Sequence, residues 1–102
     1  MFGYVVATKR LIELGGPVRF MYREIPSNDD SGWRFFAGDE DNNYLSDPDN
    51  IGIYDISSIL AIDTSVEPYL NNGPWVAYER NDDGIFVEVE DFWPQETVDE
   101  QP

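Results

Sequence analysis

The feature of this sequence that most constrains its fold is the alternation of side chains from residue 17 to residue 25. Successive side chains of a β-strand point to opposite faces, so this stretch is predicted to be a strand with two distinct faces. One face carries Val18, Phe20 and Tyr22, and the other carries Arg19, Met21 and Arg23. The polar residues 27–32 then form a connection, and 33–37 are predicted as a second strand. The two strands should pair as an antiparallel hairpin, with Arg34 near residues 23–24 of its partner.

The rest of the chain supplies further short elements. Their predicted positions are a strand at 4–7, a helix capped by Thr8 and ended by Gly15 and Gly16, a strand at 51–54, a helix capped by Asp55, a short helix at 64–70, and strands at 75–79 and 85–89. Asp83-Gly84 is a good turn signal for the last pair. Four to six strands with one or two helices indicate an α+β fold.

Length and composition favour one folded unit. The chain has 102 residues, of which 41% are hydrophobic and 15% aromatic, enough for one packed core. We therefore expect a single domain over residues 1–90, with a mainly antiparallel sheet of about five short strands and one or two short helices. Residues 91–102 hold four acidic residues and no basic one. They are predicted to be a flexible acidic tail.

The residue types that are missing restrict the chemistry. There is no cysteine and no histidine, which removes thiolate nucleophiles, imidazole bases and the common zinc ligands. Pairs of carboxylates are inevitable among 21 acidic residues and therefore carry no information. We expect no enzyme activity, no cofactor and no metal. No stretch approaches the roughly 20 apolar residues of a membrane span and no signal peptide is evident, so a cytoplasmic location is predicted.

Charge is unevenly distributed along the chain. The net charge is -15, but residues 1–23 carry a net +3, so the remaining residues carry -18. A negative field of this size repels nucleic acid and anionic membranes and speeds encounter with a basic protein. A second interpretation is that the acidic residues only keep the protein soluble.

The densest acidic stretch is residues 38–50, GDEDNNYLSDPDN, called the acidic loop below. Four side chains match ligand positions of an EF-hand calcium loop, but the positions that require glycine and glutamate hold Tyr44 and Asn50. The four matching residues are Asp39, Asp41, Asn43 and Asp47. An EF-hand is therefore excluded, whereas a weak, irregular cation site stays an alternative. Asp47 followed by Pro48 predicts a type I turn.

Aromatic residues are the second group of candidates for partner contact, because Trp and Tyr dominate binding hot spots. Phe20 and Phe35 are expected in the core. Trp33 and Tyr44 border polar loops, so we expect both to be partly exposed.

Four segments that follow one another along the chain carry a family resemblance: Met21–Glu24, Asp30–Asp41, Tyr44–Leu45 and Asp47–Tyr54. Together they resemble the bacterial Immunity protein 33 family, over residues 4–90 and most strongly over 17–80. The resemblance implies an immunity protein of a polymorphic toxin system, which binds and neutralises a toxin delivered between competing bacteria. The family offers no catalytic motif to map onto this chain, so no active-site residue is implied.

The resemblance and the regional charge together predict a stoichiometric inhibitor of a cognate protein toxin that is basic and nuclease-like. It should bind neither nucleic acid nor membrane. The predicted partner surface consists of Trp33, Asp39, Glu40, Asp41, Tyr44, Asp47 and Asp49. The alternatives are a small acidic cation- or ligand-binding module and a housekeeping domain, both without a toxin partner.

Overall fold

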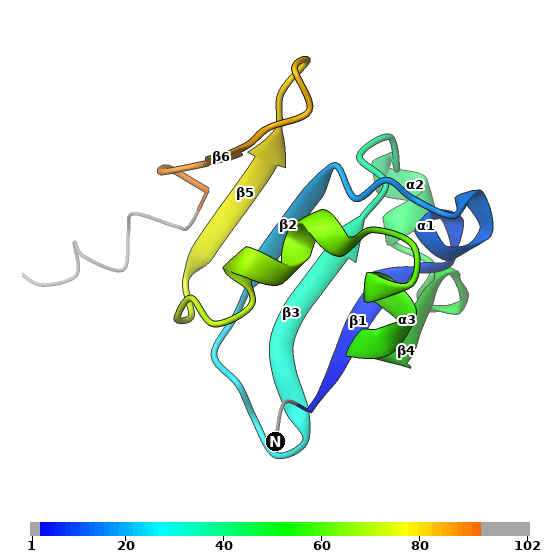
Figure 1. Cartoon of the computed structure of the whole chain (residues 1–102). Helices are drawn as coiled ribbons and strands as arrows, with labels where there is room; N and C mark the ends of the chain where they lie inside the picture. The colour runs from blue at the N-terminus through cyan, green and yellow to red at the C-terminus, as the bar shows by residue number, and fades with distance from the viewer. Residues whose placement is uncertain (1–2, 93–102) are drawn as a thin grey trace, which may run out of the picture.

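Six strands form one mixed sheet in residues 3–92, the part of the chain that the computed structural model describes. The order across the sheet is β4-β1-β3-β2-β5-β6 (Figure 1). The strands are β1 (Tyr4–Thr8), β2 (Phe20–Arg23), β3 (Asp30–Phe36), β4 (Ile51–Asp55), β5 (Val76–Arg80) and β6 (Phe86–Glu88). Neighbouring strands are antiparallel except for the parallel pair β1 and β3. The predicted α+β fold and both hairpins are confirmed, whereas the tail prediction concerns residues that mostly lie outside the described range.

Short helices connect the strands. They are α1 (Lys9–Leu14), α2 (Asn42–Leu45) and α3 (Ile56–Leu60), with 3-10 helices η1 (Pro48–Asn50) and η2 (Thr64–Tyr69). The local signals for α1 act as predicted, because the Thr8 hydroxyl accepts from the Leu11 amide and Gly15 ends the helix at φ 74°. Asp55 likewise caps α3. None of the helices in residues 3–92 is long and apolar enough to cross a bilayer.

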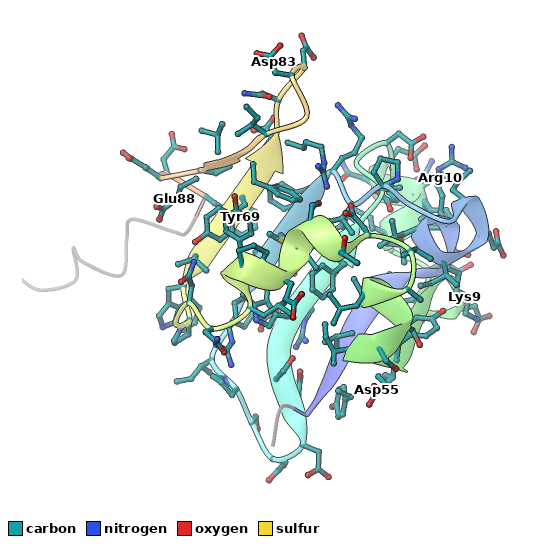
Figure 2. All side chains as sticks on the ribbon, viewed as in Figure 1. Lys9, Arg10, Asp55, Tyr69, Asp83 and Glu88 are labelled. Carbon is teal, nitrogen blue, oxygen red and sulfur yellow. The ribbon has the colours of Figure 1, made fainter. Side chains whose placement is uncertain are left out.

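The core lies between one face of the sheet and the helices α3 and η2, which cross that face (Figure 1). It contains Val5, Ala7, Leu11, Val18, Met21, Trp33, Phe35, Ile59, Val66 and Leu70, together with other apolar side chains. We call this the covered face and the opposite one the open face. Figure 2 shows Tyr69 of η2 on the covered side, where its ring packs on Tyr78 at 4.8 Å and on Phe86 at 5.4 Å.

The face of β2 that enters the core differs from the prediction. Met21 is fully buried, whereas Phe20 is only half-buried, so the assignment of Phe20 to the core is wrong. The alternation does not extend back to Val18, because β2 begins at Phe20 and Val18 is held outside the strand. There its amide donates to Asp63 Oδ2 at 2.9 Å and its carbonyl accepts from Arg80 Nε at 2.8 Å. Phe35 is in the core, as predicted.

Candidate interaction surface

The acidic loop follows β3 and folds into two short helical turns. Asp41 caps α2, accepting from the Tyr44 amide at 2.8 Å, and Asp47 caps η1, accepting from the Asp49 amide at 3.0 Å. The predicted turn is confirmed by the hydrogen bond from the Asn50 amide to the Asp47 carbonyl at 2.9 Å. Two carboxylates that matched the calcium pattern therefore serve as helix caps.

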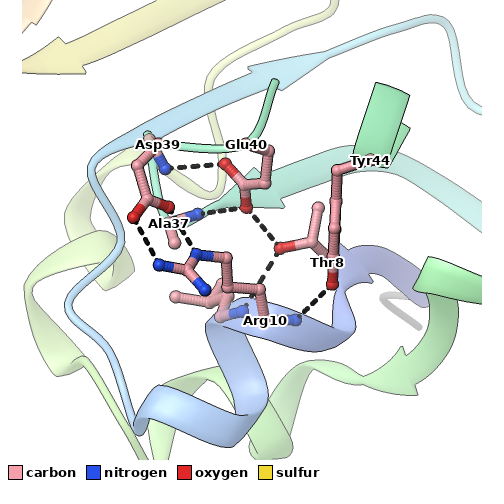
Figure 3. A network of polar contacts seen from close by, with 8 residues as sticks. Thr8, Arg10, Ala37, Asp39, Glu40 and Tyr44 are labelled. Atoms are coloured by element: carbon pink, nitrogen blue, oxygen red, sulfur yellow. Dashed lines mark hydrogen bonds and ion pairs between the residues drawn. The ribbon is translucent and has the colours of Figure 1, made fainter. Parts of the chain in front are cut away.

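Glu40 closes the turn that leads out of β3 (Figure 3). Its Oε2 accepts from the Thr8 hydroxyl at 2.5 Å and the Ala37 amide at 2.8 Å, and its Oε1 accepts from the Gly38 amide at 2.9 Å. The Thr8 hydroxyl also caps α1, so one residue links that helix to the acidic loop. The Glu40 carboxylate is thus held in place by three hydrogen-bond donors, which occupy most of its acceptor positions.

Arg10 holds α1 against the acidic loop. Its Nε and Nη2 donate to the two carboxylate oxygens of Asp39 at 2.7 and 2.6 Å, and its amide donates to the Tyr44 hydroxyl at 2.9 Å (Figure 3). This hydrogen-bonded fork holds the pKa of Asp39 below its usual value. The two side chains are 43% and 56% exposed, so the pair orients the loop more than it stabilises the fold.

Six of the seven predicted partner residues lie together on this loop. Asp39, Asp41, Asp47 and Asp49 are exposed, whereas Glu40 and Tyr44 are partly buried. The predicted partial exposure of Tyr44 is confirmed. The loop therefore presents several carboxylates on a backbone fixed by caps and by Arg10.

Trp33 is the exception, and its predicted exposure is wrong. The side chain is fully buried, its Nε1 donates to the Leu70 carbonyl at 3.1 Å, and its ring stacks on Phe35 at 5.9 Å. The reason is that β3 begins at Asp30, so Trp33 occupies the middle of a strand rather than the end of a loop. A partner cannot reach it in the folded protein.

The described residues include no group of three or more His, Cys, Asp or Glu side chains placed to hold a metal ion. Sequence reasoning missed two features of this region. Arg10 and Thr8 reach the loop from positions about 30 residues away, a contact that no local pattern reveals. The second missed feature is a hollow on the open face, which three residues of the acidic loop border: Gly38, Glu40 and Leu45. Its only signal in the sequence is that β2 carries apolar side chains on both of its faces.

Comparison with known proteins now identifies the family. The model of the Immunity protein Imm33 domain matches residues 5–90, which run from β1 past the end of β6. The chain belongs to the Imm33 family. Neither the curated proteins nor the solved structures give a significant match. The Imm33 domain therefore includes all six strands, apart from Tyr4 at the start of β1, and the acidic loop.

Proposed function

We propose that this Imm33 protein is the immunity partner of a bacterial toxin of a polymorphic system and neutralises that toxin by binding it stoichiometrically. The family match over residues 5–90 carries the proposal. Immunity proteins of this kind are generally non-catalytic, so the proposed action is to cover a functional surface of the toxin.

The charge of the chain favours a basic toxin, such as a nuclease. The net charge is -15, and the acidic loop contributes five carboxylates without a lysine or arginine. Complementary charge accelerates encounter and discriminates against wrong partners. We place the encounter in the cytoplasm, and we expect neither nucleic acid nor an anionic membrane to compete, because both are negative.

The acidic loop is the proposed contact surface because it is ordered before binding. Its carboxylates are presented by two caps and by the fork between Arg10 and Asp39. A surface that is already fixed loses less conformational entropy on association than a disordered one.

Co-expression tests the function itself. A toxin-like reading frame beside this gene, expressed alone in a sensitive host, should prevent growth, and co-expression of this protein should restore it. The purified pair should elute as a complex of one toxin to one Imm33 chain, measured by light scattering. Loss of rescue, or rescue without a complex, would contradict the proposal.

A pair of triple variants tests the contact surface. Replacing Asp39, Asp41 and Asp49 by Asn should slow association about tenfold at low salt, because rim charges act mainly on the association rate. Asn at position 41 keeps a good cap. The matched control replaces Asp82 and Asp83 by Asn and Glu88 by Gln; Figure 2 shows Asp83 and Glu88 well away from Arg10. Equal slowing in both variants would mean that net charge, not the acidic loop, governs association.

A further inference from the structure

The open face of the sheet contains a hollow of about 520 Å³. Its apolar lining includes the side chains of Val6, Phe20, Tyr22, Phe36, Leu45 and Phe92. The alternation of the strands explains its position, because Met21 and Phe35 point into the core while their neighbours Phe20, Tyr22 and Phe36 point away from it. Tyr22 is deep enough that burial raises the pKa of its hydroxyl.

The aromatic side of this hollow is packed before any partner arrives. Phe36 lies 5.8 Å from Phe20 and 5.6 Å from Tyr22, and the latter pair is stacked at 20°. Phe92 lies 5.4 Å from Phe20 and 5.0 Å from Tyr22. Rings that support one another in this way lose little side-chain freedom on binding, which is the property of an anchoring site.

Further exposed apolar side chains lie on both sides of the hollow. Ile53 of β4 is paired with Val6 and is 67% exposed, and Val87 of β6 is paired with Glu79 and is 50% exposed. Directly opposed residues of antiparallel strands share a face, so both belong to the open face. Exposed apolar side chains thus lie on the open face from β4 to β6, with Glu79 of β5 between Phe20 and Val87, and a surface of this extent suits a protein better than a small molecule.

The charges around the hollow set the chemistry of its occupant. Arg34 is its only lining cation among the described residues, and it is already bound by Asp30 through two hydrogen bonds of 2.9 and 2.8 Å. Glu24 lies 3.4 Å from Arg34 Nε as well. Glu40 is the carboxylate of the acidic loop that lines the hollow, together with Gly38 and Leu45. Arg19 lies next to Gly38 at the rim, so two arginines stand against the carboxylates of Asp30, Glu24 and Glu40. The surroundings are negative overall, although the floor is apolar.

We propose that the hollow anchors the toxin by taking an apolar side chain that projects from a basic surface, with flanking Lys or Arg side chains facing the acidic loop. This inference rests on the proposed function and adds the anchoring contact and the partner's chemistry. A second copy of the chain is the wrong occupant, because each copy carries a net charge of -15 and the two faces would repel.

The first test needs no toxin. Amide chemical shifts of the full chain are recorded during titration with benzylamine, which is a cation at neutral pH, and separately with benzoate. Benzylamine should move the amides around Val6, Phe36 and Leu45, and benzoate should not. The variant Val6→Phe, which fills the hollow, should abolish the shifts. No shifts with benzylamine, equal shifts with benzoate, or a dimer formed through this face would overturn the inference.

The second test uses the toxin domain obtained from the rescue experiment. Leu45→Arg places a cation at the border of the hollow on a side chain that is already 37% exposed, so folding should be retained. It should weaken the complex at least tenfold, mainly through faster dissociation. The control Leu14→Arg adds the same charge at a 57% exposed site outside the hollow lining and should stay within about twofold.

The outcomes of the two proposals are separable. Wild-type protein that binds no toxin refutes the proposed function, while the benzylamine titration still decides whether the hollow takes a cationic apolar group. If the wild-type protein and the Leu45→Arg variant bind the toxin equally well, the anchoring site is refuted and the proposed function is not.

Discussion

The two faces of β3 are made by adjacent residues of one strand, yet they have different properties. Trp33 and Phe35 are fully buried on the covered face, whereas Arg34 and Phe36 are partly exposed on the open face. Aromatic residues are used on both sides. The covered face supplies the core that stabilises the fold, whereas the open face carries partly exposed aromatic rings that pack on one another, where we propose that the toxin is anchored. The difference teaches that aromatic residues alone do not identify a core. Whether a face of the strand is buried depends on which other elements pack over it.

The largest predicted effect belongs to the covered face. Trp33→Ala should lower the free energy of unfolding by about 3–5 kcal/mol, because it opens a cavity and leaves the Leu70 carbonyl without its indole donor. Urea unfolding followed by circular dichroism measures the change. A loss below about 1 kcal/mol would mean that this face is not the core and would break the comparison.

The next effect concerns the attachment of η2 to the sheet. Asp63 and Arg80 are each 10% exposed, and their side chains meet at 2.7 Å, so Asp63→Asn should cost about 2 kcal/mol at neutral pH. Burial raises the pKa of Asp63, but hydrogen bonds from Ser65 and from the Val18 amide, with the charge of Arg80, lower it further than burial raises it.

This net lowering fixes the sign of a pH dependence. The carboxylate of Asp63 contributes stability above its unfolded pKa of about 3.9, and that contribution is lost as the pH falls through the lower folded pKa. Asp63→Asn should therefore flatten the decline of stability on acidification. On the open face, Asp30→Asn should flatten the decline in the same way, because the hydrogen bond from Arg34 lowers the pKa of the Asp30 carboxyl. Unfolding curves from neutral pH to pH 2 that are parallel for wild type and Asp63→Asn would contradict this assignment.

A smaller effect is expected from the open face. Phe36→Ala should cost about 1 kcal/mol, because the ring is only half-buried and its removal leaves a wider hollow rather than an enclosed cavity. The same urea assay gives the value. If Phe36→Ala destabilises the protein as much as Trp33→Ala, the two faces are energetically equivalent and the distinction fails.

The smallest effect should come from the surface of the acidic loop. Asp39→Asn should leave the urea midpoint unchanged within error, because the fork with Arg10 is exposed and screened by salt. Its visible effect should be a slower association with the toxin. A marked shift of the urea midpoint would show that the fork stabilises the fold and is not only a means of presentation.

Local structure could be predicted from the sequence, because its causes are local. Thr8 and Gly15 bound α1, Asp55 caps α3, and the turn after Asp47 forms as expected. The covered face of β2 could not be predicted, since Met21 on one side and Phe20 on the other are both apolar. The choice depends on where η2 and α3 pack, and that information lies about 40 residues further along the chain.

In the candidate site, too, the features with local causes could be predicted and those that depend on distant residues could not. The acidic loop was identified by its composition, and its caps follow from Asp and Asn chemistry. The exposure of Trp33 was mispredicted because β3 starts three residues before it, at Asp30. The hollow itself combines side chains from four strands, from α2 and from Phe92, so no single segment of the sequence contains it.

The position of β1 also matters for the synthesis of the protein. Its two neighbours, β3 and β4, end at Phe36 and Asp55, so β1 leaves the ribosome before either of its partners. Pairings between distant segments are slow to form, and both pairings of β1 are of this kind, whereas β2 and β3 form a local hairpin. A nascent chain that stops before residue 51 therefore leaves unpaired the edge of β1 that β4 covers in the folded protein.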